Sequence, residues 1–362
     1  MIFAANHPLR WAGWAAVALL LLAAPFLIEA VLGRAWVRIA DVALLFIMLA
    51  LGLNIVVGFA GLLDLGYIAF FAVGAYSYAL LASPQLAVHW PFLVLLPLCA
   101  AVAAVFGILL GGPTLRLRGD YLAIVTLGFG EIIRVFLNNL NRPVNITNGP
   151  QGITLIDPLQ LGGFSLAQTH SVAGLTFSPA HNYYFVFLAC AVISIVISLR
   201  LENSRIGRAW VAIRDDELAA SAMGINTRNM KLLAFAMGAT FGGVAGGLFA
   251  SFQGFISPES FHLIDSIMVL CMVVLGGMGN VAGVVLGAVL LTALPEALRY
   301  IGPLQQRWFG EVLIDPSDLR MLLFGLALVL MMLFRPSGIW PARRRTAMPV
   351  AEVVAEKLHV SG

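Results

Sequence analysis

Residues 39–82 read IADVALLFIMLALGLNIVVGFAGLLDLGYIAFFAVGAYSYALLA, two long apolar runs joined by a segment that contains glycines. A helix crosses a hydrocarbon core about 30 Å thick with roughly 17 to 25 apolar residues, so each run is long enough to span a membrane. The chain has 362 residues, of which 60% are apolar and 11% charged. A soluble domain has about a quarter charged residues, so an ordinary water-soluble protein is excluded.

Similar apolar runs recur along the whole chain and predict an all-α integral membrane protein with about ten transmembrane helices. We expect residues 1–341 to form one polytopic domain and residues 342–362 a flexible, basic cytoplasmic tail. The expected spans are 11–32, 39–63, 66–82, 91–112, 121–138, 183–199, 231–252, 263–275, 281–294 and 319–334.

The distribution of Lys and Arg predicts the orientation of these spans. With both termini in the cytoplasm, most of these residues fall inside, including Arg343–Arg345 after the last span, as the positive-inside rule requires. Seven of the 21, including Arg34 and Arg38, fall outside or near the outer helix ends. The net charge of +3 is too small to indicate a nucleic-acid-binding surface. The three cysteines lie in apolar runs without metal-ligand spacing, so we expect packing residues and no metal site.

Two connections are longer than a membrane turn needs, and they fall on opposite sides. The outer one, residues 138–182, is rich in Gly, Pro, Asn, Ser and Thr, which is typical of an exposed segment with short turns or hairpins. It either contacts a partner or is an ordinary surface loop. Just before it, Glu131 and Arg134 are three apart on the expected helix and are predicted to pair with each other.

The inner connection, residues 200–231, contains Asp215, Asp216 and Glu217 in a row. On a helix consecutive residues diverge by about 100°, so these acids cannot converge as a paired-carboxylate catalytic site. They suit the first turn of a short helix that begins near Asp215 and ends at Gly224. Positions 217, 220, 221 and 224 would share a face whose small residues allow another protein to approach closely.

The sequence from Glu217 to Gly224 resembles the Glu-Ala-Ala-x-x-x-Gly loop of ABC-importer permeases, whose short cytoplasmic helix docks on an ATPase subunit. Further segments resemble the branched-chain amino acid permeases of the LivM type, and the likeness covers roughly residues 40–340. These segments are GLLDLGYIAFFAVGAY at 61–76, RGDY at 118–121, RAWVAIRD at 208–215, the glycine-rich run from 238 to 258, and GGMGN at 276–280.

This resemblance implies a non-catalytic permease subunit in a bacterial inner membrane. Its partners would be two ABC ATPase subunits, a second related permease and a periplasmic amino-acid-binding protein, and the cargo would be leucine, isoleucine, valine or a related amino acid. The expected ATPase-coupling residues are Arg208, Arg214, Asp215, Asp216, Glu217, Ala219, Ala220 and Gly224. No Gly-x-x-x-x-Gly-Lys-Ser/Thr loop occurs, so the partner subunits would bind ATP and this chain would need no cofactor.

Two glycine-rich segments are candidates for the translocation path, because helix breaks in a membrane are tolerated only where protein or a water-filled cavity satisfies the freed backbone groups. They contain Gly61, Asp64 and Gly66, and Gly276, Gly277, Gly279 and Asn280. The alternative is that both are tight turns at the inner membrane face.

Other readings of the same sequence stay open. Relatives of this fold carry urea, amides or other small solutes. An ion-coupled secondary transporter is less favoured, because it should place more acids inside the membrane. Gly238, Gly242 and Gly246 recur every four residues on one expected span and indicate close helix packing, within the chain rather than with a second permease.

Overall fold

A computed structural model describes residues 8–86, 88–114, 117, 119–161, 164–172, 175–299, 305, 322–323, 325–326, 329–331, 333–335 and 338–341. The long helices are α1 (Pro8–Leu32), α2 (Arg34–Leu53), α3 (Ile68–Leu81), α4 (Phe92–Thr114), α5 (Asp120–Asn139), α6 (Pro179–Glu202), α9 (Thr227–Gln253), α10 (Leu263–Gly276) and α11 (Val281–Arg299). The π-helix η1 (Asn54–Phe59) extends α2 directly. The expected all-α membrane architecture is therefore confirmed in its main outline.

Six described helical segments are long and apolar enough to cross a membrane: Arg34–Phe59, Phe92–Thr114, Pro179–Glu202, Thr227–Gln253, Pro258–Gly276 and Val281–Arg299. Leu19–Leu32 and Ile68–Leu81 are apolar but shorter. Helix α5 has 20 residues and is nevertheless absent from this set. Seven of the sixteen residues of the tenth expected span, 319–334, and the whole tail 342–362 lie outside the described residues. The count of about ten spans stays a prediction.

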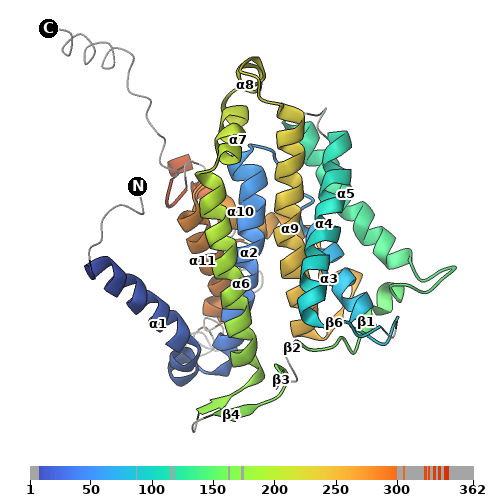
Figure 1. Ribbon diagram of the computed structural model, residues 1–362, viewed down its shortest axis with the longest axis vertical. Coiled ribbons are helices and arrows are strands. Elements are labelled where there is room, and N and C mark those ends of the chain that lie inside the picture. Colours follow the sequence, from blue (N-terminus) through green and yellow to red (C-terminus); the bar gives the residue numbers. More distant parts are fainter. Residues whose placement is uncertain are drawn as a thin grey trace.

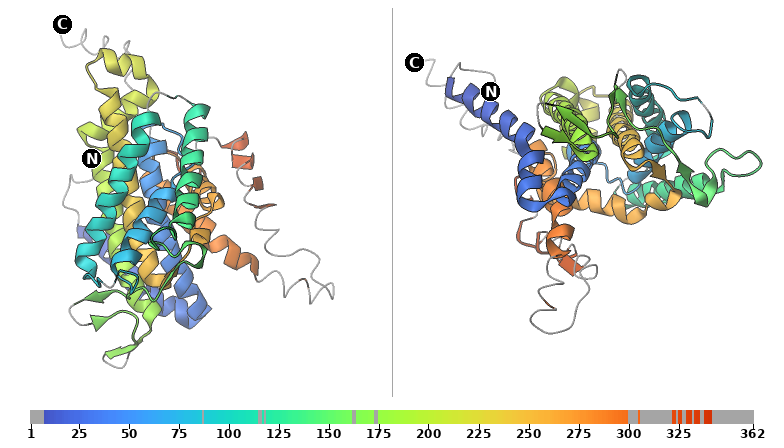
Figure 2. Two further views of the ribbon diagram at one scale, coloured as in Figure 1. Left: turned by 90° about the vertical axis from the view of Figure 1, so that its right-hand side faces the viewer. Right: turned by 90° about the horizontal axis from the view of Figure 1, so that it is seen from below.

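The segment α2–η1 lies at the centre of the bundle. In its most apolar stretch, 89% of the residues are buried within the chain. In the corresponding stretches of α4 and α6 only 28% of the residues are buried, so most of their residues are at least partly exposed. Such outward apolar faces suit lipid or another membrane subunit. Figure 2 shows α1 at the margin of the bundle, away from α4 and α5.

Glycines on α9 let its backbone approach α2, α3 and α4. A Cβ on Gly238 would meet Gly52 and Val56, and one on Gly242 would meet Phe70. Gly243 faces α4, where an added Cβ would lie 2.5 Å from both the Cβ of Ala103 and the carbonyl oxygen of Cys99. The expected role in close packing within the chain is therefore confirmed.

The two long connections lie at opposite ends of the bundle (Figure 1). One end has α7 (Arg205–Asp215) and α8 (Glu217–Ala222), and the other has the strands. The expected hairpins are present as β2 (Gln160–Leu161) with β3 (Phe164–Ser165), and β4 (His170–Val172) with β5 (Leu175–Phe177). The same connection also contains the short helix η2 (Gly149–Gln151), which precedes the strands.

A third antiparallel pair, β1 (Ile153–Thr154) with β6 (Phe255–Ile256), ties the outer connection to the chain after α9. The sequence pattern did not indicate it, because a two-residue strand has no measurable period. The pair positions η3 (Pro258–Ser260) and the start of α10 at the outer end.

Adding one methyl group at two helical glycines tests this packing. Gly243→Ala should lower the free energy of unfolding by about 1 to 3 kcal/mol, because the backbone and Ala103 around the new Cβ cannot move aside freely. Thermal unfolding in detergent measures the change. Gly112→Ala on α4 is the matched control, since its Cβ would meet nothing within 4 Å and alanine favours a helix. An equal loss in both variants would contradict the packing role.

Candidate functional site

The inner end of the molecule carries a short helix close to the expected position. Helix α8 begins at Glu217, and the side chain of Asp216 caps it by accepting hydrogen bonds from the amides of Leu218 (2.8 Å) and Ala219 (3.0 Å). The helix starts two residues after Asp215, near the expected start, because Asp215 ends α7 and the extended backbone of Asp216 separates the two helices. Gly224 has φ of +85° just after α8, as a helix-terminating glycine should.

The face of α8 that carries Glu217 and Ala220 is turned toward the chain itself. Ala220 is buried, and the Glu217 carboxylate lies 2.6 Å from the Nζ of Lys231, whose side chain is 7% exposed. Of the four positions expected to share an open face, Glu217 and Ala220 are therefore turned inward, whereas Ser221 and Gly224 are exposed, and the approach of another protein to this face stays a prediction. The buried ammonium of Lys231 draws Glu217 inward, and Leu218, Ala219, Ser221 and Met223 form the exposed side.

Helix α7 is anchored to two other elements. The indole of Trp210, which is fully buried, donates to the carbonyl of Met230 at 2.7 Å and so holds α7 on the start of α9. At its other end, the guanidinium of Arg214 donates to the carbonyl of Gly58 in η1. Arg208 donates to the carbonyl of Asn203 at the start of the helix pair. Arg214 was among the coupling residues predicted from the sequence, whereas Trp210 and Lys231 were not.

The first glycine segment is an irregular stretch between η1 and α3, so the expected break is present. Asp64 is fully buried, and its Oδ1 accepts from the amide of Gly66 at 2.9 Å. A Cβ on Gly66 would collide with the carbonyl of Thr126 on α5, and Gly61, at φ of +70°, lies against the side chain of Arg214. Glycine is required at both positions by these close approaches.

Side chains of two neighbouring helices satisfy the backbone of this break. The amide of Leu65 donates to Oγ1 of Thr126 on α5 at 3.0 Å, and the amide of Ile68 donates to Oγ of Ser266 on α10 at 2.9 Å. Free amides inside a membrane are costly, so these two hydroxyls stabilise the break. Neither residue was indicated by the sequence, because Thr and Ser are common in helices with other roles.

The second glycine segment is a tight turn between α10 and α11, which is the alternative that the sequence left open for it. Gly277 and Gly279 have φ of +119° and +82°, values that favour glycine. Asn280 caps α11 by accepting from the amide of Ala282 at 3.0 Å. Gly276 and Gly283 face each other so closely that a Cβ on either would meet the other's carbonyl.

The two glycine segments meet through Asn54, a residue that was not among the site residues predicted from the sequence. Oδ1 of Asn54, at the start of η1, accepts from the amide of Gly279 at 2.8 Å, and both groups are buried. The segment 54–68 therefore contacts α7 through Gly58, α5 and α10 through the hydroxyls of Thr126 and Ser266, and the α10–α11 turn through Asn54. This convergence is the candidate functional site.

The sequence resembles named transport proteins over most of its length. The sequence model of a family described as the permease component of the branched-chain amino acid transport system matches residues 35–332. The high-affinity branched-chain amino acid transport system permease protein LivM of Escherichia coli is 43% identical over 343 residues, 91% of this chain and 75% of that protein. The permease protein LivH of the same organism is 27% identical over 260 residues, 70% of this chain and 81% of that protein. No solved structure matches the chain.

A pair of substitutions at Thr126 tests the support of the break. Thr126→Val removes the acceptor of the Leu65 amide at nearly constant volume, and a buried amide without a partner costs about 1 to 3 kcal/mol. We expect faster hydrogen exchange in residues 60–68, measured by mass spectrometry in detergent. Thr126→Ser keeps the hydroxyl and should exchange like the wild type; equal rates in the two variants would show that the hydroxyl is dispensable.

Proposed function

The chain belongs to the family of branched-chain amino acid transport permease components, and on that premise we propose that it is one of two permease subunits of an ATP-driven importer for leucine, isoleucine and valine. The 43% identity to the LivM protein over 91% of the chain carries this proposal. The chain is a membrane permease and not an enzyme, as its relatives are named. The second permease would be a related chain, since LivH, which also resembles this chain, is named as a permease of the high-affinity system.

In this proposal the ATPase subunits bind at the inner end. Leu218 on α8 and Met223 directly after it expose 70% and 84% of their surface. Two large apolar side chains held out on a capped short helix suit a protein groove. The ATPases bind ATP, and this chain requires no cofactor of its own. We place both termini in the cytoplasm of a cell with an inner membrane, and the hairpins β2–β3 and β4–β5 on the outer side, where the amino-acid-binding protein delivers its ligand.

The contacts of α7 and α8 provide a route from the ATPases to the membrane segment. Movement of α8 would act on α9 through the ion pair of Glu217 and Lys231, and on η1 through Arg214 and the Gly58 carbonyl. From η1, the bond of Asn54 to Gly279 reaches the turn between α10 and α11. Rigid shifts of packed helices along these contacts would open the path alternately to the two sides.

Reconstituted transport tests the function directly. The chain co-purified with its partner subunits should take up radiolabelled leucine into proteoliposomes only under two conditions. ATP must be on the side of the membrane that carries the ATPases, and the binding protein must be on the opposite side. Uptake without ATP, driven by an ion gradient, would overturn the proposal. ATPase stimulation by a binding protein loaded with another solute would keep the architecture and change the cargo.

Two groups of variants should separate docking from transmission. Leu218→Glu and Met223→Glu place a charge in the apolar contact, so the ATPase subunits should no longer co-purify with the membrane subunits. Arg214→Gln leaves that contact intact but removes the guanidinium that binds the Gly58 carbonyl. We expect this variant to retain the ATPases and to lose about tenfold in leucine transported per ATP hydrolysed, about 1.4 kcal/mol of coupling.

Arg205→Gln is the matched control, because Arg205 is an exposed residue at the other end of the same helix. It removes the same charge and should retain both ATPase association and transport. Loss of transport in Arg205→Gln as in Arg214→Gln would assign the effect to overall charge and not to the contact with Gly58.

A further inference from the structure

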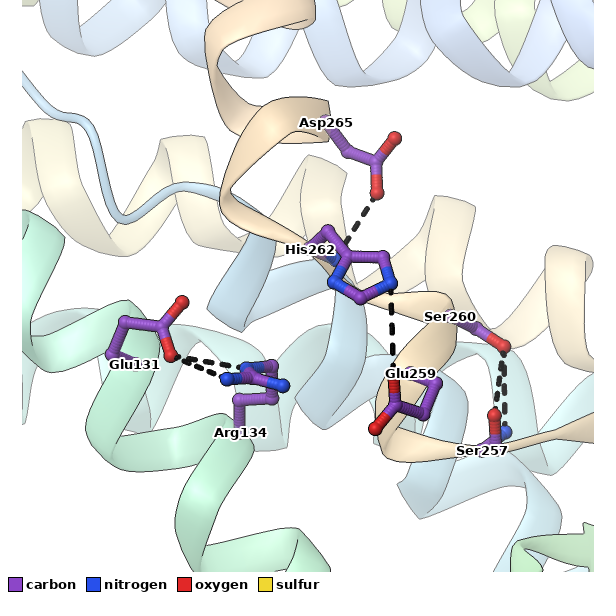
Figure 3. A network of polar contacts seen from close by, with 7 residues as sticks. All are labelled: Glu131, Arg134, Ser257, Glu259, Ser260, His262 and Asp265. Atoms are coloured by element: carbon purple, nitrogen blue, oxygen red, sulfur yellow. Dashed lines mark hydrogen bonds and ion pairs between the residues drawn. The ribbon is translucent and has the colours of Figure 1, made fainter. Parts of the chain in front are cut away.

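Charged side chains gather where α5 passes the outer end of α10. Helix α5 packs against both η3 and α10. Figure 3 shows Glu131 and Arg134 on α5, with the Arg134 guanidinium extending toward the loop that carries Glu259 and His262. The outer charge cluster, as we name it, consists of Glu131, Arg134, Glu259, His262 and Asp265.

The expected ion pair on α5 is confirmed, with Nε and Nη2 of Arg134 lying 3.0 and 2.9 Å from Oε2 of Glu131. The two side chains remain 32% and 37% exposed on the chain. A charged side chain that faces lipid costs about 2.5 to 3.5 kcal/mol near the centre of a membrane helix. The side of α5 that carries this pair is therefore suited to protein or water and not to lipid, which agrees with the absence of α5 from the apolar spanning helices.

The other half of the cluster is partly accessible as well. Nε2 of His262 lies 3.8 Å from Oε2 of Glu259, with the two side chains 51% and 65% exposed. Asp265 accepts from the amide of His262 at 3.1 Å and so caps α10. Across the described residues, no three His, Cys, Asp or Glu side chains converge as metal ligands, so the arrangement does not favour a metal ion.

Polar groups continue from this cluster toward the break. Further along the same two helices are Thr126, five residues before Glu131 on α5, and Ser266, the residue after Asp265 on α10, and both bind the backbone of the break. Within the break, Oδ2 of Asp64 is buried and has no hydrogen-bond partner in the part of the chain that the structure describes. Unpaired buried carboxylate oxygens are rare because each costs free energy. The polar groups on α5 and α10 thus lead from the outer end to an acceptor that lacks a donor.

We propose that the outer charge cluster is the site at which the permease receives a zwitterionic amino acid. The guanidinium of Arg134 is the group best shaped to bind a carboxylate, and the carboxylates of Glu131, Glu259 and Asp265 attract an ammonium group. The same part of α10 exposes Ile264 and Ile267, apolar surface of the kind that an aliphatic side chain contacts. A neutral solute such as urea has no use for either charge, so the cluster distinguishes amino acids from the other cargoes of this fold. This assignment rests on the proposed import function and names its site.

Ligand-induced stabilisation of the purified importer complex, without the binding protein, tests the site. A ligand that binds only the folded state stabilises it by RT ln(1 + [L]/Kd), so a weaker ligand needs a proportionally higher concentration for the same rise in melting temperature. L-leucine should stabilise the complex, whereas 4-methylpentanoate, which lacks the ammonium, leucinamide, which lacks the carboxylate, and urea should each need at least tenfold higher concentration. Equal stabilisation by urea or by 4-methylpentanoate, or none by leucine, would overturn the proposal.

Variants of the pair distinguish a binding site from a helix-stabilising contact. Arg134→Gln should raise at least tenfold the leucine concentration that gives the same rise in melting temperature as in the wild type. The double exchange Glu131→Arg with Arg134→Glu keeps an ion pair three residues apart; a purely structural pair would tolerate it, but the proposed site should lose its response to leucine. Arg299→Gln is the matched control, because Arg299 forms an equivalent pair with Glu296 on α11, with Nη1 3.4 Å from Oε1. An unchanged leucine response in Arg134→Gln, or its loss in Arg299→Gln, would contradict the assignment.

Transport measurements keep this proposal separate from the proposed function. If the wild-type complex imports leucine with ATP but the double exchange responds to leucine normally, the import function stands and the receiving site is wrong. If leucine stabilises the wild-type complex but is not imported with ATP, the site stands and the ATP-driven mechanism is wrong.

Discussion

Backbone amides that are buried away from water need hydrogen-bond acceptors, and this constraint decides where the chain between η1 and α3 can lie. The break exposes the amides of Leu65, Gly66 and Ile68, and side chains of Thr126, Asp64 and Ser266 accept their hydrogen bonds. Two of these acceptors belong to α5 and α10, so both helices must stand beside the break. The absence of side chains at Gly66 and at Gly243 allows the necessary approach of one backbone to another.

The same requirement links elements that are far apart in the sequence. Asn54 accepts from Gly279, 225 residues later, and Arg214 reaches the Gly58 carbonyl across 156 residues. A helix that continued regularly through residues 58–68 would bond the Gly58 carbonyl and the amides of Leu65 and Ile68 within itself. The irregular backbone of η1 and the break therefore allows these groups to bond to α7, α5 and α10, whereas Asn54 reaches the α10–α11 turn with its side chain.

Charge follows a related rule. In two ion pairs of the bundle, a partner of opposite charge compensates the loss of hydration of each group. Lys231 is nearly buried and has Glu217 as its partner, whereas Glu131 and Arg134 pair with each other and remain partly exposed toward η3 and α10. The first pair joins α8 to α9 at the inner end. The second lies on the polar side of α5, a helix of 20 residues that is as long as a membrane span.

The sequence by itself determined the membrane class, the positions of most spans, the opposite placement of the two long connections and the family, because apolar length and local motifs are properties of contiguous residues. It also predicted the glycine stripe of α9, the Glu131–Arg134 pair and the short helix at Glu217, whose periods and spacings are local. Only the tertiary structure decided that Glu217 and Ala220 face α9, that residues 276–280 form a turn, and that Asn54, Thr126, Ser266, Trp210 and Lys231 hold the site together. Each of these depends on which group of a distant segment comes within about 3 Å, and that is set by the packing of helices and not by any pattern in neighbouring residues.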